Sequence, residues 1–586
     1  MMLRMLGKIF VAASLLFALL PTAVTAQEKM ALLIGNSNYE QHPDGYSWSA
    51  LPNPVNDVEV VGEALEAIDF TVTVVSNGTK AEMSEALDRF SAESADAEVV
   101  IFYFAGHGFE YDRRNFLVPI DAPIKVGEHE LEEEFVDFEK LASRLSHAGT
   151  MLFILDACRT GSDFVGPGQG AEGFQPTSRS APTPIVMTRA TTLGGGQPIQ
   201  PASAGVNDYD FPPGANVAVL FSTGRGVPAY DAAPPPTHLS PFALEVSRFI
   251  GLPKIEVSST FNAIRQGVYD RTKVFSPPQA PYTYNSLPPR VYLSENDARN
   301  RNIDLEQTEG LNVTLEEMAR TDENILILRV LAEHTVEEIQ WLADNNDPVA
   351  TYFLGYMQEF GIGVPRDLEK ARATLEKAAA FETPYGELEL AYFLHHNGKN
   401  AADRQRAVSL YESAAGRDFA KARAHYARVL MAGVLVEQSP ENYRAGLEQL
   451  KQATESKYPY AFYALALADG AENQAQWIGS LEALREDGDV DADHWLCVFN
   501  VQKSNYDIAV PLCENAAEAG YADAQAYLAR ANHEGWVSEP SPRLAKHWMR
   551  QAISSPDLPA GLCAQLLTMR IELGDVGIEA PCSRSS

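Results

Sequence analysis

The segments VVIFYFAGHG (residues 99–108) and MLFILDACRTG (residues 151–161) decide the fold of this chain. Each is a short apolar run typical of a buried strand, and each ends in a reactive side chain, His107 in the first and Cys158 in the second. An open α/β sheet gathers its ligands and its chemistry just outside the carboxyl ends of its strands. The two segments therefore predict adjacent strands that bring an imidazole and a thiol to the same edge of a sheet.

Residues 27 to about 300 alternate β-rich runs with amphipathic helical stretches, which is typical of a mostly parallel sheet covered by helices on both faces. The expected strands span residues 29–35, 71–75, 99–105, 151–156, 216–222 and 290–293. Between the first two strands, Asn53 has the side chain of an N-cap and Pro54 suits the first helical position. Asp57 then lies in the first turn of a helix, at the functional edge of the sheet.

The first 26 residues have the pattern of a secretory signal. Arg4 and Lys8 provide a basic start, residues 9–20 an apolar core, and residues 24–26 a small-residue cleavage site. No other stretch approaches the roughly 18 to 20 apolar residues of a membrane span. We expect an exported, periplasmic or secreted protein with no membrane span once the signal is removed; an uncleaved anchor is the alternative.

The acidic composition argues against nucleic acid as a partner. The net charge is −33, from 79 acidic and 46 basic residues. Such a surface repels nucleic acid and favours basic partners. The alternative is that the acidic residues only keep the protein soluble.

The cysteines are distributed unevenly. Cys497, Cys513, Cys563 and Cys582 lie near the end of the chain, whereas Cys158 stands alone in the N-terminal half. Exposed thiols of exported proteins tend to pair. Bridges from Cys497 to Cys513 and from Cys563 to Cys582 would leave Cys158 as the single free thiol, but four cysteines permit three pairings.

A linker over residues 301–329 precedes a helical region over residues 330–586. Residues 347–380 have the pattern of a helix, a Gly-x-Gly-Val turn and a second helix. Similar but less regular segments follow at residues 406–433 and 513–552. A period of about 35 to 40 residues with this content is typical of an α-solenoid. The repeats resemble the TPR-related Sel-like family, which implies protein binding through a concave face. Tyr352, Tyr356, Tyr426 and Trp548 are candidates to line that face, but at helical spacing the core is their expected place.

His107 is the natural partner of a cysteine nucleophile. An unperturbed thiol is only a few per cent thiolate at neutral pH, so Cys158 needs a base or a cation beside it. The glycines that flank His107 let the backbone approach a substrate closely. The amides of Gly108 and Cys158 are candidates for an oxyanion hole.

Asp156 lies two residues before Cys158, so on an extended strand the two side chains share one face. A carboxylate there hinders thiolate formation, because like charges disfavour one another. The simplest reason for its presence is a pocket for a cationic substrate group, with Asp57 as a second acid. The alternative for Asp57 is stabilisation of a helix N-terminus.

Five motifs in sequence order, ALLIGNSNY (31–39), NPVNDVEVV (53–61), YFAGHG (103–108), FLVPIDAP (116–123) and FILDAC (153–158), resemble the caspase family. The paracaspase, orthocaspase and metacaspase-related branch is most similar. The resemblance implies an α/β caspase-like sandwich over residues 27–300, followed by the helical-repeat solenoid. It also implies a His107/Cys158 dyad, with Asp57 and Asp156 in an Arg/Lys-specific pocket.

The chain departs from true caspases at Asp156, where they carry Gln, and this argues against cleavage after aspartate. The segment 216–231 fits the family more loosely and makes Asp231 a candidate third pocket acid. Residues 161–214 form an expected long loop rich in Gly, Pro, Ser and Thr, a length that is uncommon in compact domains. Its two basic residues, Arg179 and Arg189, suit self-processing; a passive insert is the alternative.

Three function classes follow. The first is an exported cysteine endopeptidase that cleaves proteins after Arg or Lys and uses its repeats to bind a protein partner. The second is a catalytically silent caspase-like scaffold that acts through its repeats. The third, a nucleotide-binding domain, has little support, because the glycines of residues 166–173 lie in the long loop rather than between a strand and a helix. No metal site or cofactor is predicted, and calcium activation, though compatible with the sequence, is not indicated by it.

Overall fold

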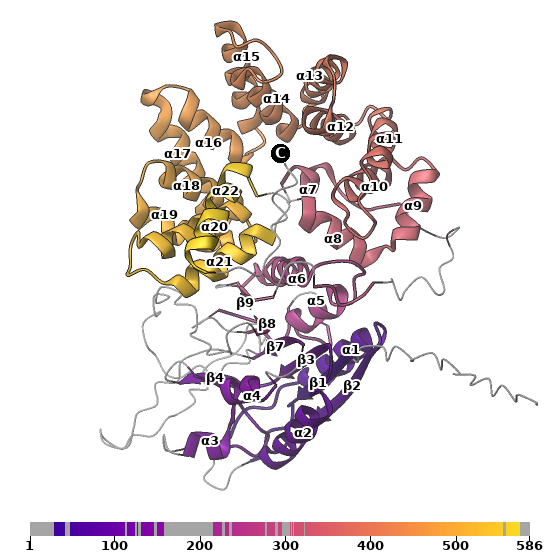
Figure 1. Cartoon of the computed structure of the whole chain (residues 1–586), viewed down its shortest axis with the longest axis vertical. Coiled ribbons are helices and arrows are strands. Elements are labelled where there is room, and N and C mark those ends of the chain that lie inside the picture. The colour runs from indigo at the N-terminus through magenta and orange to yellow at the C-terminus, as the bar shows by residue number, and fades with distance from the viewer. Residues whose placement is uncertain are drawn as a thin grey trace, which may run out of the picture.

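The computed structural model describes residues 29–574, except 42–46, 112–113, 124–125, 127–129, 146–148, 158–214, 225–228, 234–236, 276–277, 288–290, 296–304, 306–307, 309, 321–322 and 555–557. Within this part of the chain, strands and covering helices come first and a succession of helices follows (Figure 1). The predicted fold class, a caspase-like α/β sandwich with an all-α solenoid, is confirmed.

The main sheet has six strands in the order β2-β1-β3-β7-β8-β9. They are β1 (Lys29–Gly35), β2 (Phe70–Ser76), β3 (Val99–Ala105), β7 (Thr150–Asp156), β8 (Asn216–Phe221) and β9 (Tyr282–Asn285). All neighbours are parallel except β8 and β9. The first five strands agree with the predicted ranges to within one residue, because continuous apolar runs in buried parallel strands are a strong signal.

The prediction of a last strand at residues 290–293 was wrong. In the described part of that segment Tyr292 forms only an isolated bridge with Glu256. The sixth strand is β9, and its four residues follow a proline-rich stretch that hides the strand pattern. A small antiparallel sheet of β4 (Gly108–Tyr111), β5 (Arg114–Leu117) and β6 (Val136–Asp137) was also not predicted.

Both faces of the main sheet are covered by helices, as predicted. One face packs on α1 (Pro54–Glu66), α5 (Pro241–Phe249) and α6 (Val257–Thr272), through residues such as Leu33 and Tyr103. The opposite face packs on α2 (Lys80–Glu93) and α4 (Phe138–Arg144), through residues such as Leu32 and Phe102. Successive strand residues point to opposite faces, so one apolar run supplies both cores.

The helical part continues from α7 (Leu315–Arg320) in antiparallel pairs. Its helices are α8 (Glu323–Glu333), α9 (Val336–Asp344), α10 (Pro348–Phe360), α11 (Leu368–Ala379), α12 (Pro384–Asn397), α13 (Ala401–Gly416), α14 (Ala420–Ala432), α15 (Pro440–Thr454), α16 (Pro459–Ala468), α17 (Ala471–Glu486), α18 (Val490–Gln502), α19 (Tyr506–Glu518), α20 (Ala522–Glu534), α21 (Pro542–Ser554) and α22 (Ala560–Glu572). The expected core positions Tyr352, Tyr356 and Trp548 are buried, and Tyr426 is half-buried.

A disulfide joins Cys497 of α18 to Cys513 of α19, as predicted. Cys563 is also disulfide-bonded. Its predicted partner Cys582 lies outside the described residues, so that pairing stays a prediction.

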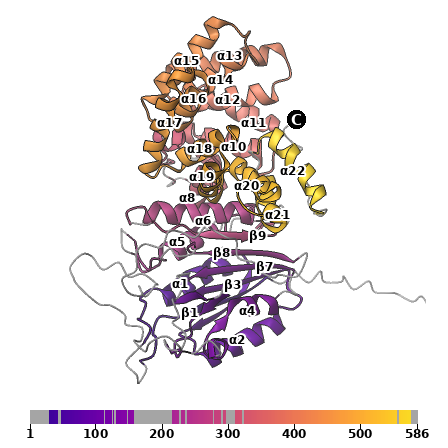
Figure 2. The same cartoon turned by 90° about the vertical axis from the view of Figure 1, so that its left-hand side faces the viewer.

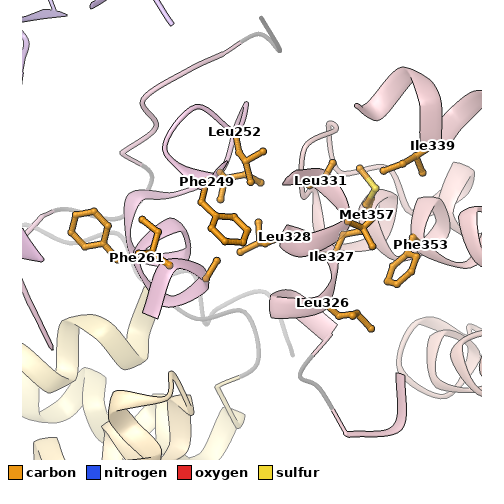
Figure 3. Packing of buried hydrophobic residues seen from close by; sticks show 14 of the residues in the cluster. Phe249, Leu252, Phe261, Leu326, Ile327, Leu328, Leu331, Ile339, Phe353 and Met357 are labelled. Atoms are coloured by element: carbon orange, nitrogen blue, oxygen red, sulfur yellow. The ribbon is translucent and has the colours of Figure 1, made fainter. Parts of the chain in front are cut away.

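The first helices of the solenoid share a hydrophobic core with the sheet domain. Phe249 and Phe261, from α5 and α6, belong to the same buried cluster as Ile327 and Leu328 of α8 and Met357 of α10. Figure 3 shows Phe249 beside Leu328 in this cluster. Because this core is continuous, the start of the solenoid is fixed firmly to the sheet domain.

The far end of the solenoid also contacts the sheet domain. The His547 ring of α21 stacks on Tyr284 of β9 with the ring centroids 5.7 Å apart. Arg550 donates from Nη1 to the carbonyl oxygen of Ser286 at 3.4 Å. Figure 2 shows α21 next to β9, the edge strand of the sheet. The helices therefore touch the sheet domain through an apolar contact at one end and a more polar one at the other.

We expect this second contact to weaken in acid. Burial, and then the nearby Arg550, Arg543 and Arg265, lower the pKa of His547 to about 3. The unfolded histidine binds its proton near pH 6.5, so stability should fall as the pH drops below that value. Between pH 7 and pH 5 wild-type protein should lose about 2 kcal/mol more than His547→Phe, measured by denaturant unfolding. An equal loss in both proteins would contradict this.

Candidate active site

The register of β3 and β7 sets the geometry of the site. The two strands are parallel neighbours, and their pairs run from Val99 with Thr150 to Ala105 with Asp156. Every pair keeps a separation of 51 residues, the same separation that divides His107 from Cys158. His107 follows the end of β3 by two residues, whereas Cys158 lies outside the described residues, which end at Ala157 on this strand.

The His107 side chain is fully buried and closely held. Its Nε2 lies 2.8 Å from the carbonyl oxygen of Ser49, and its ring centroid lies 4.7 Å from that of Tyr39 and 5.2 Å from that of Trp48. A carbonyl oxygen only accepts, so Nε2 carries the proton and donates it to Ser49. In the neutral imidazole the lone pair is then on Nδ1, which makes Nδ1 the basic atom.

The backbone of His107 is fixed as well. Its amide donates to the Tyr39 hydroxyl at 2.8 Å, and its carbonyl accepts from the Val118 amide at 3.0 Å. Gly108 directly follows as the first residue of β4 and is buried. The position of the imidazole is therefore set by the end of β3 and by the start of the small sheet.

Gly106 is required by close packing, and its substitution gives a direct test. A Cβ at this position would lie 2.8 Å from the Tyr39 hydroxyl oxygen and 3.0 Å from Cζ of Phe104. Because Tyr39 holds the His107 amide, Gly106→Ala should push it away and lower the unfolding free energy by about 1–3 kcal/mol. Gly416→Ala is the matched control, since nothing lies within 4 Å of a Cβ there. Equal midpoints in denaturant for both variants would contradict the argument.

The three predicted pocket acids, Asp57, Asp156 and Asp231, are all fully buried. The first two meet at one residue, Ser240, which is the N-cap of α5. The Ser240 amide donates to Oδ1 of Asp57 at 2.9 Å, and its hydroxyl donates to Oδ2 of Asp156 at 2.6 Å. Two carboxylates from α1 and β7 are thus held together at the carboxyl edge of the sheet.

Asp231 is held near α1 by its backbone. The Asn53 side-chain amide donates to the carbonyl oxygen of Asp231. Asn53 is the N-cap residue of α1, as predicted, but its side chain makes no capping hydrogen bond; its Nδ2 donates to the distant Asp231. Gln279 supports the same segment by accepting from the Tyr230 amide at 2.9 Å and donating to the carbonyl of Ser222 at 2.7 Å.

Sequence reasoning missed several residues that position the site. Ser240 lies far from the acids along the chain, and only its helix-capping pattern before Pro241 marked it. Tyr39, Trp48 and Ser49 surround His107, yet a loop of such residues has no periodic signal. Of the predicted site residues, Cys158, Arg179 and Arg189 lie outside the described part of the chain. In the described part, no group of three or more His, Cys, Asp or Glu side chains could hold a metal ion.

The fold and this strand-end arrangement agree with the family comparisons. Residues 28–292 match the model of the caspase domain, and residues 348–380, 384–419 and 522–557 match the Sel1 repeat. This chain thus has a caspase-family domain followed by Sel1 repeats, as the sequence predicts.

Two curated relatives match part of the chain. It is 33% identical over 141 residues to human mucosa-associated lymphoid tissue lymphoma translocation protein 1 and 32% identical over 141 residues to the mouse homolog. In both cases the match covers 24% of this chain and 16% of the relative.

Two solved structures match part of this chain. A Sel1 repeat protein from Oxalobacter formigenes is 19% identical at a TM-score of 0.29, over 37% of this chain and 92% of that one. The protective antigen c5321 of uropathogenic Escherichia coli, which displays an SLR fold, is 23% identical at a TM-score of 0.27, over 43% of this chain and 54% of that one.

Proposed function

We propose that this chain is an exported cysteine endopeptidase that cleaves polypeptides after Arg or Lys. The register of β3 and β7 carries the proposal. If the pairing continues by two residues past Ala105 and Asp156, Cys158 comes beside His107. Because the sequence separation between paired residues is constant along two parallel strands, residues at the same distance past the two strand ends lie side by side.

In this mechanism His107 acts as the base. Nδ1 takes the thiol proton of Cys158, and the thiolate attacks the carbonyl carbon of the scissile peptide bond. The hydrogen bond from Nε2 to the carbonyl of Ser49, 2.8 Å long and partly buried, holds the required tautomer. His107 then returns the proton to the leaving amine, and water hydrolyses the thioester. The amides of Gly108 and Cys158 are the proposed donors to the oxyanion of the intermediate.

Specificity for Arg or Lys comes from the paired acids in this proposal. Asp57 and Asp156 are buried, and both accept from Ser240, so their carboxylates lie close together. A buried pair of carboxylates is costly unless a cation approaches, and the substrate guanidinium or ammonium supplies that cation. Asp231 is proposed as a third acid, because its segment is anchored to α1 through Asn53.

The remaining parts of the proposal rest on the sequence. Residues 1–26 support export, and Arg179 and Arg189 are proposed self-processing sites, but all lie outside the described residues. Among the described residues, no helix is long and apolar enough to cross a membrane. The Sel1 repeats support binding of a protein partner or substrate.

The test is hydrolysis of short fluorogenic peptides by the purified protein. Peptides that end in Arg or Lys should be cleaved, whereas matched peptides that end in Asp or Leu should not. Assays with reductant, with calcium and with a calcium chelator cover the conditions that the sequence leaves open. No hydrolysis of the Arg peptide in any of them would overturn the proposal and favour the silent scaffold.

A further inference from the structure

A large cleft lies between the solenoid and the sheet domain, away from the candidate active site. It has a volume of about 1580 Å³, larger than the roughly 300–1,000 Å³ of small-molecule pockets. Its floor is α6, and its walls come from α8 with the α10–α11 turn on one side and from the start of α18 with the start of α20 on the other. None of Asp57, His107, Asp156 and Asp231 lines it. We call this space the inner cleft.

One wall of the inner cleft is acidic. Its carboxylates come from the α17–α18 connection, the first turn of α18 and the start of α20, and they are Glu486, Asp487, Asp489, Asp491 and Asp523. Within the described part of the chain, neither Glu486 nor Asp487 forms an ion pair with a lysine or arginine, and both are exposed. Tyr269 of α6 lies against this wall: its hydroxyl is 3.5 Å from the carbonyl oxygen of Gly488, and its pKa is raised first by burial and then by Asp270, Asp493 and Asp489. This wall therefore favours a cation.

A buried histidine positions one of the carboxylates on the same wall. The side chain of His494, which lines the cleft, is 5% exposed, and its Nε2 lies 2.8 Å from Asp523. Its ring stacks on Tyr521 with centroids 4.1 Å apart. Its Nδ1 has no hydrogen-bond partner among the described residues. Because Nδ1 is itself buried, the contribution of His494 to this wall is its hydrogen bond to Asp523, which holds that carboxylate in place.

The opposite wall is apolar except for the exposed Arg366 at its end. Phe360, Ile362 and Val364 at the α10–α11 turn line the cleft and are half-buried, next to the exposed Pro365. The floor offers amides for a peptide backbone, from Asn262 and Gln266 of α6. Carboxylates on one side, amides below and apolar side chains on the other match an extended peptide that carries basic and apolar side chains in turn.

We infer that the inner cleft is a docking site for an extended, basic and partly apolar segment of a protein substrate. This rests on the proposed function, since the substrates of that peptidase carry Arg or Lys. Docking at α6 would hold the substrate at a second place besides the candidate active site. The two places are connected through α5, because α5 packs on α6 and its N-cap is Ser240, which binds both acids. Thr283 and Asn285 of β9 and Gln551 of α21 line the cleft, and a space of about 1580 Å³ holds an extended segment rather than a folded domain.

The test uses the full chain with Cys158→Ala, so that the probe is not cleaved. A fluorescent peptide that alternates arginine and leucine should bind, and one that alternates glutamate and leucine should not. Adding Glu486→Gln and Asp487→Asn should weaken binding on the order of 10-fold. Adding Glu437→Gln and Glu482→Gln instead, two exposed acids outside the cleft, should leave the affinity unchanged. Higher salt should weaken binding to the unmodified cleft most.

The outcomes separate this inference from the proposed function. With Cys158 restored, Glu486→Gln/Asp487→Asn should cleave a short Arg-ending peptide at the wild-type rate. It should show a higher KM and an unchanged kcat for a long substrate with a basic, apolar tail. If the short peptide is cleaved but both acid pairs affect probe binding equally, the docking site is refuted and the peptidase stands. If probe binding follows the cleft acids but no peptide is cleaved, the cleft stands and the proposed peptidase falls. Self-association that Glu486→Gln/Asp487→Asn abolishes would assign the cleft to a second copy and overturn the substrate inference.

Discussion

His107→Ala should lower kcat/KM for an Arg-ending peptide reporter by about 10²–10⁴-fold, the usual contribution of general acid–base catalysis. The reason is that Nδ1 of His107 no longer takes the thiol proton of Cys158. Cys158→Ala should abolish hydrolysis, since no nucleophile remains. His533→Ala is the matched control, because His533 pairs with Glu572 in the solenoid.

Rescue by added imidazole separates a catalytic from a structural role for His107. Low concentrations of imidazole should restore part of the activity of His107→Ala if the ring acts as a base. Rates in His107→Ala within a few-fold of wild type would remove His107 from the mechanism. An unfolding midpoint close to that of wild type, measured alongside, shows that the variant is folded.

Asp156→Asn should reduce kcat/KM for Arg- and Lys-ending reporters by about 10- to 150-fold, the loss of one charge-assisted hydrogen bond of about 1.5–3 kcal/mol. The amide keeps the shape of the side chain and an oxygen to accept from the Ser240 hydroxyl, so the loss reports the charge. The ratio of kcat/KM for reporters that end in a neutral residue to kcat/KM for Arg-ending reporters should rise. Asp88→Asn, at an exposed acid paired with Arg144, is the control. An unchanged ratio between Arg and neutral reporters would exclude Asp156 from the pocket.

The edge of the sheet that carries His107 could be predicted because its signals are local. Buried parallel strands read as continuous apolar runs, so β1, β3 and β7 were placed to within one residue. The residues that follow each strand, Gly-His-Gly after β3 and Ala-Cys after β7, can be recognised from that segment alone, whichever strand pairs with it. β9 could not be found in this way, because four residues after a proline-rich stretch have little pattern of their own.

The residues that support the site were not predictable, because their partners are far away in sequence. Ser240 is 183 positions from Asp57 and 84 from Asp156, yet it donates to both carboxylates. Asn53 has the composition of an N-cap, but tertiary structure directs its amide to Asp231 instead. Propensity describes a residue in its own segment, whereas a buried polar group bonds to whatever partner the fold brings near.

The sequence by itself determined the first five strands of the main sheet, the residues that follow β3 and β7, and the 51-residue spacing that relates His107 to Cys158. The pairing of β3 with β7 has the same 51-residue separation between partners. The two parallel strands therefore end at the same level of the sheet. Only the tertiary structure decided that Ser240 joins the two acids and that α8 and α21 bring the solenoid back onto the sheet domain. Local pattern sets an element, but contacts between distant elements depend on how the whole chain buries its apolar surface.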